Sequence, residues 1–156
     1  MKINIIKGSG TGPTELSAFD SALIDAGIGN QNLIYLSSVI PPGSEIVFTK
    51  PSFEPNDFGS KLYVVISEDR TSTPGQEIWV GIGWVQEAST QKGLFVEHHS
   101  NTKKDLEDMI TSSLTHMTSA RPGENWGKIQ MATEGVSCKD KPVSVLVSAV
   151  YKTVGW

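Results

Sequence analysis

Short apolar segments separated by clusters of Pro, Gly, Asn and Asp make up most of this chain and point to a fold rich in β-structure. The clearest separators are residues 51–59 and 71–75. The segments of strand length are residues 2–6, 33–36, 45–48, 61–67, 78–85, 93–98, 129–133 and 143–151. No repeat period and no shift in composition marks a second domain, so we expect one domain over residues 1–156.

Only two stretches space their apolar residues as a helix does. Residues 14–26 follow Pro13 and precede Gly27, which we expect to be the C-cap residue. We expect the buried face of this helix to consist of Leu16, Phe19, Leu23 and Ala26. Residues 102–117 predict the second helix. The predicted fold class is therefore α+β, with mainly antiparallel sheet and two principal helices.

Charge and cysteine content exclude several classes of protein. The net charge of −4, with no basic cluster, argues against nucleic acid as the main partner. A lone cysteine, Cys138, rules out an intramolecular disulfide and a Cys-based zinc site. No signal peptide and no apolar run of about 18 residues is visible, so we expect a cytoplasmic protein with no membrane span.

A Gly-rich segment, residues 7–12, follows the first predicted strand, and we expect it to form a loop. Such a loop invites a phosphate-binding interpretation. It lacks both the Gly-Lys-Ser/Thr ending of a P-loop and the glycine spacing of a dinucleotide fingerprint. We therefore do not expect a nucleotide site.

Residues 27–43 carry the strongest functional signal, a Ser37–Ser38 pair followed by Pro-Pro-Gly. Such a peptide can cut itself when the Ser38 hydroxyl attacks the Ser37 carbonyl, the amide becomes an ester, and β-elimination breaks the ester. The resulting dehydroalanine hydrolyses to a pyruvoyl group and ammonia. A pyruvoyl carbonyl can form a Schiff base with an amino acid and accept electrons as carbon dioxide leaves. The alternative is that the two serines merely end a strand before a turn.

The residues around this pair resemble the pyruvoyl-dependent arginine decarboxylases. The resemblance rests on Glu15–Leu23 (ELSAFDSAL), Ala26–Asn30 (AGIGN), Asn32–Ile34 (NLI) and Ser37–Pro42 (SSVIPP). It is nearly gap-free from about Pro13 to Ile46 and resumes more weakly near residues 93–97.

The resemblance implies a sandwich-like fold and self-cleavage into a β chain, residues 1–37, and an α chain, residues 38–156. It implies a covalent pyruvoyl cofactor made from Ser38, and decarboxylation of L-arginine to agmatine. It further implies a homo-oligomer, a trimer or hexamer, because active sites of the family lie between neighbouring subunits.

The same resemblance assigns roles to individual residues. Ser38 becomes the pyruvoyl group and Ser37 the new carboxylate end. Asn32 supports the oxyanion during cleavage, Glu97 returns a proton after decarboxylation, and Asp20 holds the guanidinium of the substrate.

Each role has a structural alternative. A turn Asn can bond its own backbone, and a strand Glu can simply face solvent. We nevertheless expect partial burial of Glu97, whose neighbours in the strand are apolar, and burial tends to raise a carboxyl pKa. Asp20, at the rim of a helical apolar face, could be a structural group, and its carboxylate would also accept an ammonium.

The sequence departs from the family at His98-His99-Ser100, where relatives commonly have an aromatic residue, a variable residue and a glycine. The two histidines alternate to opposite faces of a strand, so we expect no metal site. The departure leaves the substrate open between arginine and another cationic amino acid. An unprocessed, non-catalytic ligand- or partner-binding relative is the other alternative. A Ser-His-Asp hydrolase is disfavoured because no Gly-x-Ser-x-Gly elbow is present.

Overall fold

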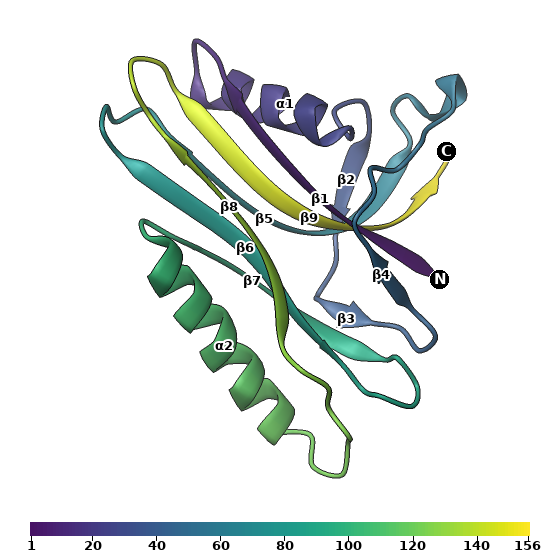
Figure 1. Ribbon diagram of the computed structural model, residues 1–156. Coiled ribbons are helices and arrows are strands. Elements are labelled where there is room, and N and C mark those ends of the chain that lie inside the picture. Colours follow the sequence, from purple (N-terminus) through teal and green to yellow (C-terminus); the bar gives the residue numbers. More distant parts are fainter.

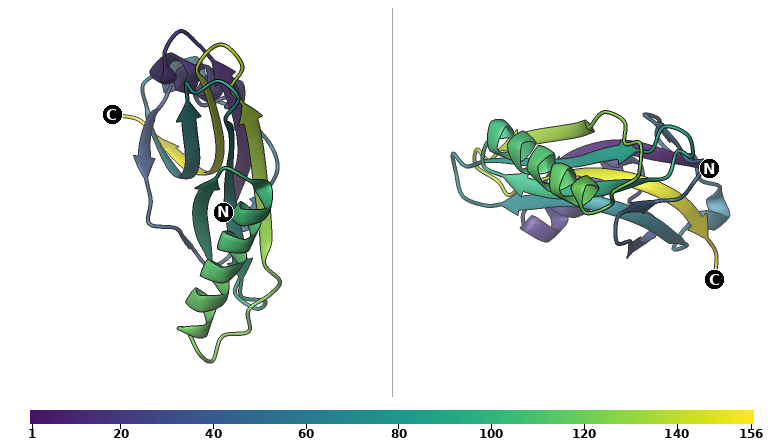
Figure 2. Two further views of the ribbon diagram at one scale, coloured as in Figure 1. Left: turned by 90° about the vertical axis from the view of Figure 1, so that its left-hand side faces the viewer. Right: turned by 90° about the horizontal axis from the view of Figure 1, so that it is seen from below.

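The computed structural model describes residues 1–156 as two β-sheets packed face to face, with one helix on the outer side of each sheet (Figure 1). Figure 2 shows the helices α1 and α2 on opposite sides of the two sheets. The helices are α1 (Glu15–Ala26) and α2 (Lys103–Ser119), with a short 3₁₀ turn at Pro55–Asp57. Neither helix is both long and apolar enough to cross a membrane.

The first sheet has the strand order β2-β5-β9-β1-β4 and the second the order β3-β7-β6-β8. The strands of the first sheet are β1 (Lys2–Thr11), β2 (Asn32–Tyr35), β4 (Glu45–Val47), β5 (Lys61–Thr71) and β9 (Val143–Val154). Those of the second are β3 (Val39–Ile40), β6 (Glu77–Gln86), β7 (Gly93–Ser100) and β8 (Gln130–Ser137). Only the pairs β1–β4 and β2–β5 are parallel. The predicted α+β class with mainly antiparallel, sandwich-like sheets is confirmed.

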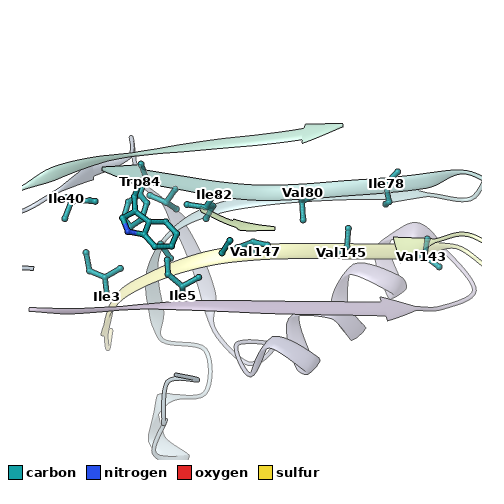
Figure 3. Packing of buried hydrophobic residues seen from close by; sticks show 14 of the residues in the cluster. Ile3, Ile5, Ile40, Ile78, Val80, Ile82, Trp84, Val143, Val145 and Val147 are labelled. Atoms are coloured by element: carbon teal, nitrogen blue, oxygen red, sulfur yellow. The ribbon is translucent and has the colours of Figure 1, made fainter. Parts of the chain in front are cut away.

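The main core fills the space between the two sheets. Figure 3 shows side chains of β6 facing those of β1 and β9 across this layer, with Trp84 among them. Two smaller clusters lie outside, one under α1 and one under α2. Over much of each sheet, both faces of the strands therefore pack against apolar side chains.

The contact between α1 and β1 corrects two predictions. The Gly-rich segment is not a loop, because β1 continues through it to Thr11 and pairs with β9. The glycines let the helix come close, since a Cβ at Gly8 would lie 2.2 Å from the carbonyl oxygen of Ala22. The predicted buried face of α1 is also wrong in part. Leu16 is 69% exposed, and the fully buried residues of α1 are Ala18, Ala22 and Ala26.

The chain changes sheets just after β2. Residues 36–38 carry it from the edge of the first sheet to β3, a two-residue strand at the edge of the second. The sequence analysis did not predict β3, because two residues show no periodicity. This crossover contains the Ser37–Ser38 peptide and places it at the sheet edges.

Candidate active site

The crossover is held at both of its ends. Before it, the amide of Leu36 donates to the carbonyl oxygen of Val64 at 2.9 Å, which extends the pairing of β2 with β5. After it, Val39 pairs with Leu94 of β7. The Ser37–Ser38 peptide thus spans two anchored strands that belong to different sheets.

Ser38 adopts a left-handed backbone conformation with φ of 67°. This conformation costs a non-glycine residue about 1–2 kcal/mol, so its neighbours must hold it there. The Phe95 amide donates to the Ser38 carbonyl oxygen at 2.8 Å. The Ser38 hydroxyl donates to Oε2 of Glu97, also at 2.8 Å. Two residues proposed from sequence for the same site, 59 positions apart, therefore touch.

Glu97 lies on β7 opposite Ile82, on the face that looks toward the first sheet. Its side chain is exposed, so the expected partial burial is wrong for this chain. The reason is the shortness of β3, whose strand pairing covers β7 only at Gly93 and Leu94. The edge of β7 beyond Phe95 is left open, and Glu97 lies on that open edge.

Tyr151, which the sequence analysis did not single out, secures the residue after the Ser pair. Its hydroxyl donates to the carbonyl oxygen of Val39 at 2.9 Å, and its ring meets the Phe95 ring edge-on at 6.3 Å between centroids. Burial, with the nearby Glu97 charge, raises the pKa of Tyr151, so the phenol stays protonated and remains a donor. One Tyr at the end of an apolar strand carries no sequence signal for this role.

A pocket of about 420 Å³ opens beside Ser38. Its lining residues are Ser37, Ser38, Phe95, Val96, Glu97, His98, Ser113 and Met117. Helix α2 thus supplies part of the wall through Ser113 and Met117, and the sequence analysis missed both. Both are partly buried, Met117 against the apolar cluster under α2, and only the packing of α2 on β7 brings them to the pocket.

The two histidines after Glu97 point to opposite faces of β7, as predicted. Nε2 of His98 lies 2.7 Å from Oγ of Ser113 on α2, whereas Nδ1 of His99 lies 3.3 Å from a carboxylate oxygen of Asp69 on β5. Burial lowers the pKa of His98, and His99 lowers it further, although Glu97 acts in the opposite direction. No group of three potential metal ligands is present.

The other two predicted site residues do not lie beside Ser38. Asn32 donates its side-chain amide to the carbonyl oxygen of Gly59 at 2.6 Å, and no hydrogen bond reaches the carbonyl oxygen of Ser37. Asp20 is exposed on α1, which covers the outer side of the first sheet, whereas β7 belongs to the second sheet. It makes no hydrogen bond or ion pair. One chain therefore brings together Ser37, Ser38 and Glu97, but not Asn32 or Asp20.

Comparisons of the sequence with a family model and with curated proteins identify the same family. The sequence matches the family model described as pyruvoyl-dependent arginine decarboxylase over residues 2–154. A protein of this name from Halobacterium salinarum is 39% identical over 117 residues, covering 73% of this chain and 71% of its own length. Another, from Thermococcus sibiricus, is 31% identical over 150 residues, covering 96% and 93%.

One solved structure, of a pyruvoyl-dependent histidine decarboxylase at pH 8, aligns with a TM-score of 0.46. The sequence identity is 11%, and the alignment covers 69% of this chain and 55% of the other. This likeness is too low to carry an argument.

The left-handed conformation of Ser38 can be tested with two variants that both lack the hydroxyl. Ser38→Gly relieves the backbone strain, whereas Ser38→Ala keeps it. We expect Ser38→Gly to be more stable than Ser38→Ala by about 0.5–1 kcal/mol, the usual balance of strain against chain entropy. Urea unfolding measures the difference. Equal stability, or a more stable alanine variant, would contradict a strained residue 38.

Proposed function

Since this chain belongs to the pyruvoyl-dependent arginine decarboxylase family, we propose that it cuts itself between Ser37 and Ser38 and then decarboxylates L-arginine to agmatine and carbon dioxide. The observation that carries the proposal is the state of Ser38, a strained residue whose hydroxyl is held by Glu97. Family membership supplies the cofactor class, a covalently bound pyruvoyl group, and the proposal assigns its origin to Ser38.

Cleavage proceeds by an N-to-O acyl shift, a β-elimination and a hydrolysis. The oxygen of the Ser38 side chain attacks the Ser37 carbonyl carbon, a C–O bond replaces the C–N bond, and the nitrogen of residue 38 takes up a proton. Loss of the α-proton of residue 38 then breaks the Cβ–O bond and releases Ser37 as a carboxylate. One water converts the remaining dehydroalanine to the pyruvoyl group and ammonia. Glu97 orients the attacking hydroxyl through its 2.8 Å hydrogen bond.

The residues present fit a pyruvoyl group at position 38. The Phe95 amide already binds the carbonyl oxygen that would adjoin the ketone carbon, and Tyr151 holds the next residue through Val39. Cleavage would leave both new ends anchored, the first by β2 on β5 and the second by β3 on β7. The open pocket next to Glu97 leaves room for an amino acid.

A pyruvoyl group at residue 38 would supply a carbonyl that reacts with the substrate amine and an electron sink for the loss of carbon dioxide. The chain must then supply a proton at the substrate α-carbon. Glu97 is the acid in our proposal, because its carboxyl group contacts the Ser38 side chain from which the ketone carbon's methyl group derives. The apolar neighbours Phe95 and Val96 limit water on one side of the pocket.

Asn32 remains our candidate for oxyanion support, on the strength of the family resemblance alone. Its amide is engaged with Gly59, so it would have to change partner or act from another subunit. The Ser37 carbonyl needs such a donor, since no hydrogen bond reaches its oxygen.

Recognition of the cationic end of the substrate would require a second copy of the chain. Asp20 lies between Leu16 and Ile24 on one stripe of α1, and these apolar residues are 69% and 62% exposed. An unpaired carboxylate within an exposed apolar stripe suits an interface that closes over a guanidinium. We therefore propose a homotrimer or a hexamer in which the α1 stripe of one subunit faces the pocket of its neighbour. A cytoplasmic location remains a prediction.

Intact mass measurement of the purified chain tests the proposed cleavage. We expect two fragments, residues 1–37 and 38–156, with the larger one carrying the mass of a pyruvoyl end. Borohydride with arginine should trap an adduct on that fragment, and Ser38→Ala should stay whole. A wild-type chain that stays whole after prolonged incubation would instead favour the non-catalytic binding relative.

Glu97→Gln separates the two roles of this residue. Glutamine can still accept the Ser38 hydrogen bond but has no proton to transfer, so we expect cleavage largely intact and decarboxylation reduced by about 10²-fold or more. Carbon dioxide release per cleaved chain measures this, with Glu45→Gln, an exposed strand glutamate outside the pocket, as control. Wild-type turnover in Glu97→Gln would remove Glu97 from the chemistry.

The two-subunit site predicts complementation between inactive variants. Asp20→Asn should cleave normally but bind arginine weakly, because the guanidinium loses its counter-charge. Co-expressed with Glu97→Gln, it should restore about a quarter of wild-type activity, since random rings contain intact composite sites at that frequency. Absence of recovery in mixed oligomers would place Asp20 outside the site or within the same chain's site.

A further inference from the structure

The pocket wall formed by β7 and α2 contains a hydrogen-bonded pair that neither the cleavage nor the proton transfer uses. Nε2 of His98 and Oγ of Ser113 are 2.7 Å apart, and both side chains line the pocket with Ser38. This contact is the only hydrogen bond made by the His98 ring and by the Ser113 hydroxyl. The two residues come from different elements, so their contact is a product of the packing of α2 on β7.

The pair has one donor to spare in either tautomer of the histidine. If Nε2 carries the proton, it donates to Ser113, and the serine hydroxyl hydrogen is free. If Nδ1 carries the proton, the serine donates to Nε2, and the Nδ1 hydrogen is free. A neutral His98 with Ser113 therefore has one hydrogen-bond donor without a partner in either tautomer, and both residues line the pocket.

On the basis of the proposed function, we propose that the His98–Ser113 pair binds the α-carboxylate of the substrate. The substrate amine is consumed at residue 38, and its cationic end extends toward Asp20 of another subunit. The other polar groups of the pocket repel a carboxylate, because Glu97 is acidic and Ser37 becomes a carboxylate end on cleavage. The His98–Ser113 pair is what remains among the lining side chains to accept it.

The electrostatics of this wall suit a carboxylate that must leave as a neutral molecule. Burial lowers the pKa of His98, so near pH 7 the ring is neutral and binds through a hydrogen bond and not an ion pair. A strong ion pair would stabilise the carboxylate more than the transition state, in which its charge moves away, and would slow the reaction. Val96 and Met117 line the same wall and provide an apolar surface for carbon dioxide.

Two ligands that cannot be decarboxylated at residue 38 separate binding of the carboxylate from binding of the amine and the guanidinium. Agmatine has the amine and the guanidinium but no carboxylate, whereas 5-guanidinopentanoate has the guanidinium and the carboxylate but no amine. Calorimetry on the oligomeric protein gives the affinity of each ligand without relying on turnover. We expect His98→Phe and Ser113→Ala to weaken 5-guanidinopentanoate on the order of 10-fold, the usual effect of losing a hydrogen bond to a charged group. Agmatine affinity should not change.

The double variant should lose no more than either single variant, because the two residues act as one unit. Ser112→Ala, an exposed neighbour on α2, is the matched control and should bind both ligands as the wild type does. Cleavage at residue 38 in each variant reports that the fold is intact.

Unchanged affinity for 5-guanidinopentanoate, or an equal loss for both ligands, would overturn the carboxylate role while leaving the decarboxylase proposal standing. A wild-type chain that neither cleaves nor binds agmatine would instead overturn the proposed function, and this inference with it.

Discussion

The hydrogen bond from the Phe95 amide to the Ser38 carbonyl is the contact on which the site depends. It fixes the residue just before β3 on β7, at the point where the chain has just left the other sheet. Ser38, the last residue of the crossover, takes a left-handed conformation there. The same contact sets Ser38 beside Phe95, two residues before Glu97 on β7, so the strained backbone and the acid arise from a single strand register.

This arrangement explains how the fold could survive a cut in its own chain. Residues 1–37 contain β1, a strand paired on both sides, with β9 and β4 as neighbours. Ile3, Ile5 and Ile6 of β1 are buried, in two different core clusters. A cut at the crossover breaks one covalent bond but exposes none of this apolar surface, so the hydrophobic effect keeps the two pieces together. Ser38 is thus strained at a position where the packing of the two pieces does not depend on chain continuity.

In the proposed mechanism, the single chain contains the reacting groups but only some of the groups that recognise the substrate. Ser38 and Glu97 meet within it, and α2 adds the His98–Ser113 pair to the same pocket. The carboxylate suited to a cationic substrate, Asp20, lies across the molecule in an exposed apolar stripe. Exposure of Glu97 and exposure of that stripe have a common explanation if both surfaces meet in an oligomer, where one subunit covers the open edge of β7 of another.

Local patterns in the sequence determined the helices and most strand positions, because periodicity and turn residues are properties of neighbouring residues. The proposed chemistry of the Ser37–Ser38 pair came from the resemblance of the surrounding residues to the family. Only the tertiary structure decided which residues that are far apart in the chain contact one another. Gly8 and Gly10 allow α1 to pack closely on β1 and do not form a loop, because the close contact exists only once helix and sheet have packed together. The strand β3, the roles of Tyr151 and Ser113, and the exposure of Glu97 all follow from how two sheet edges and α2 meet. No local pattern encodes these contacts, because each joins residues that are far apart in the sequence and meet only in the folded chain.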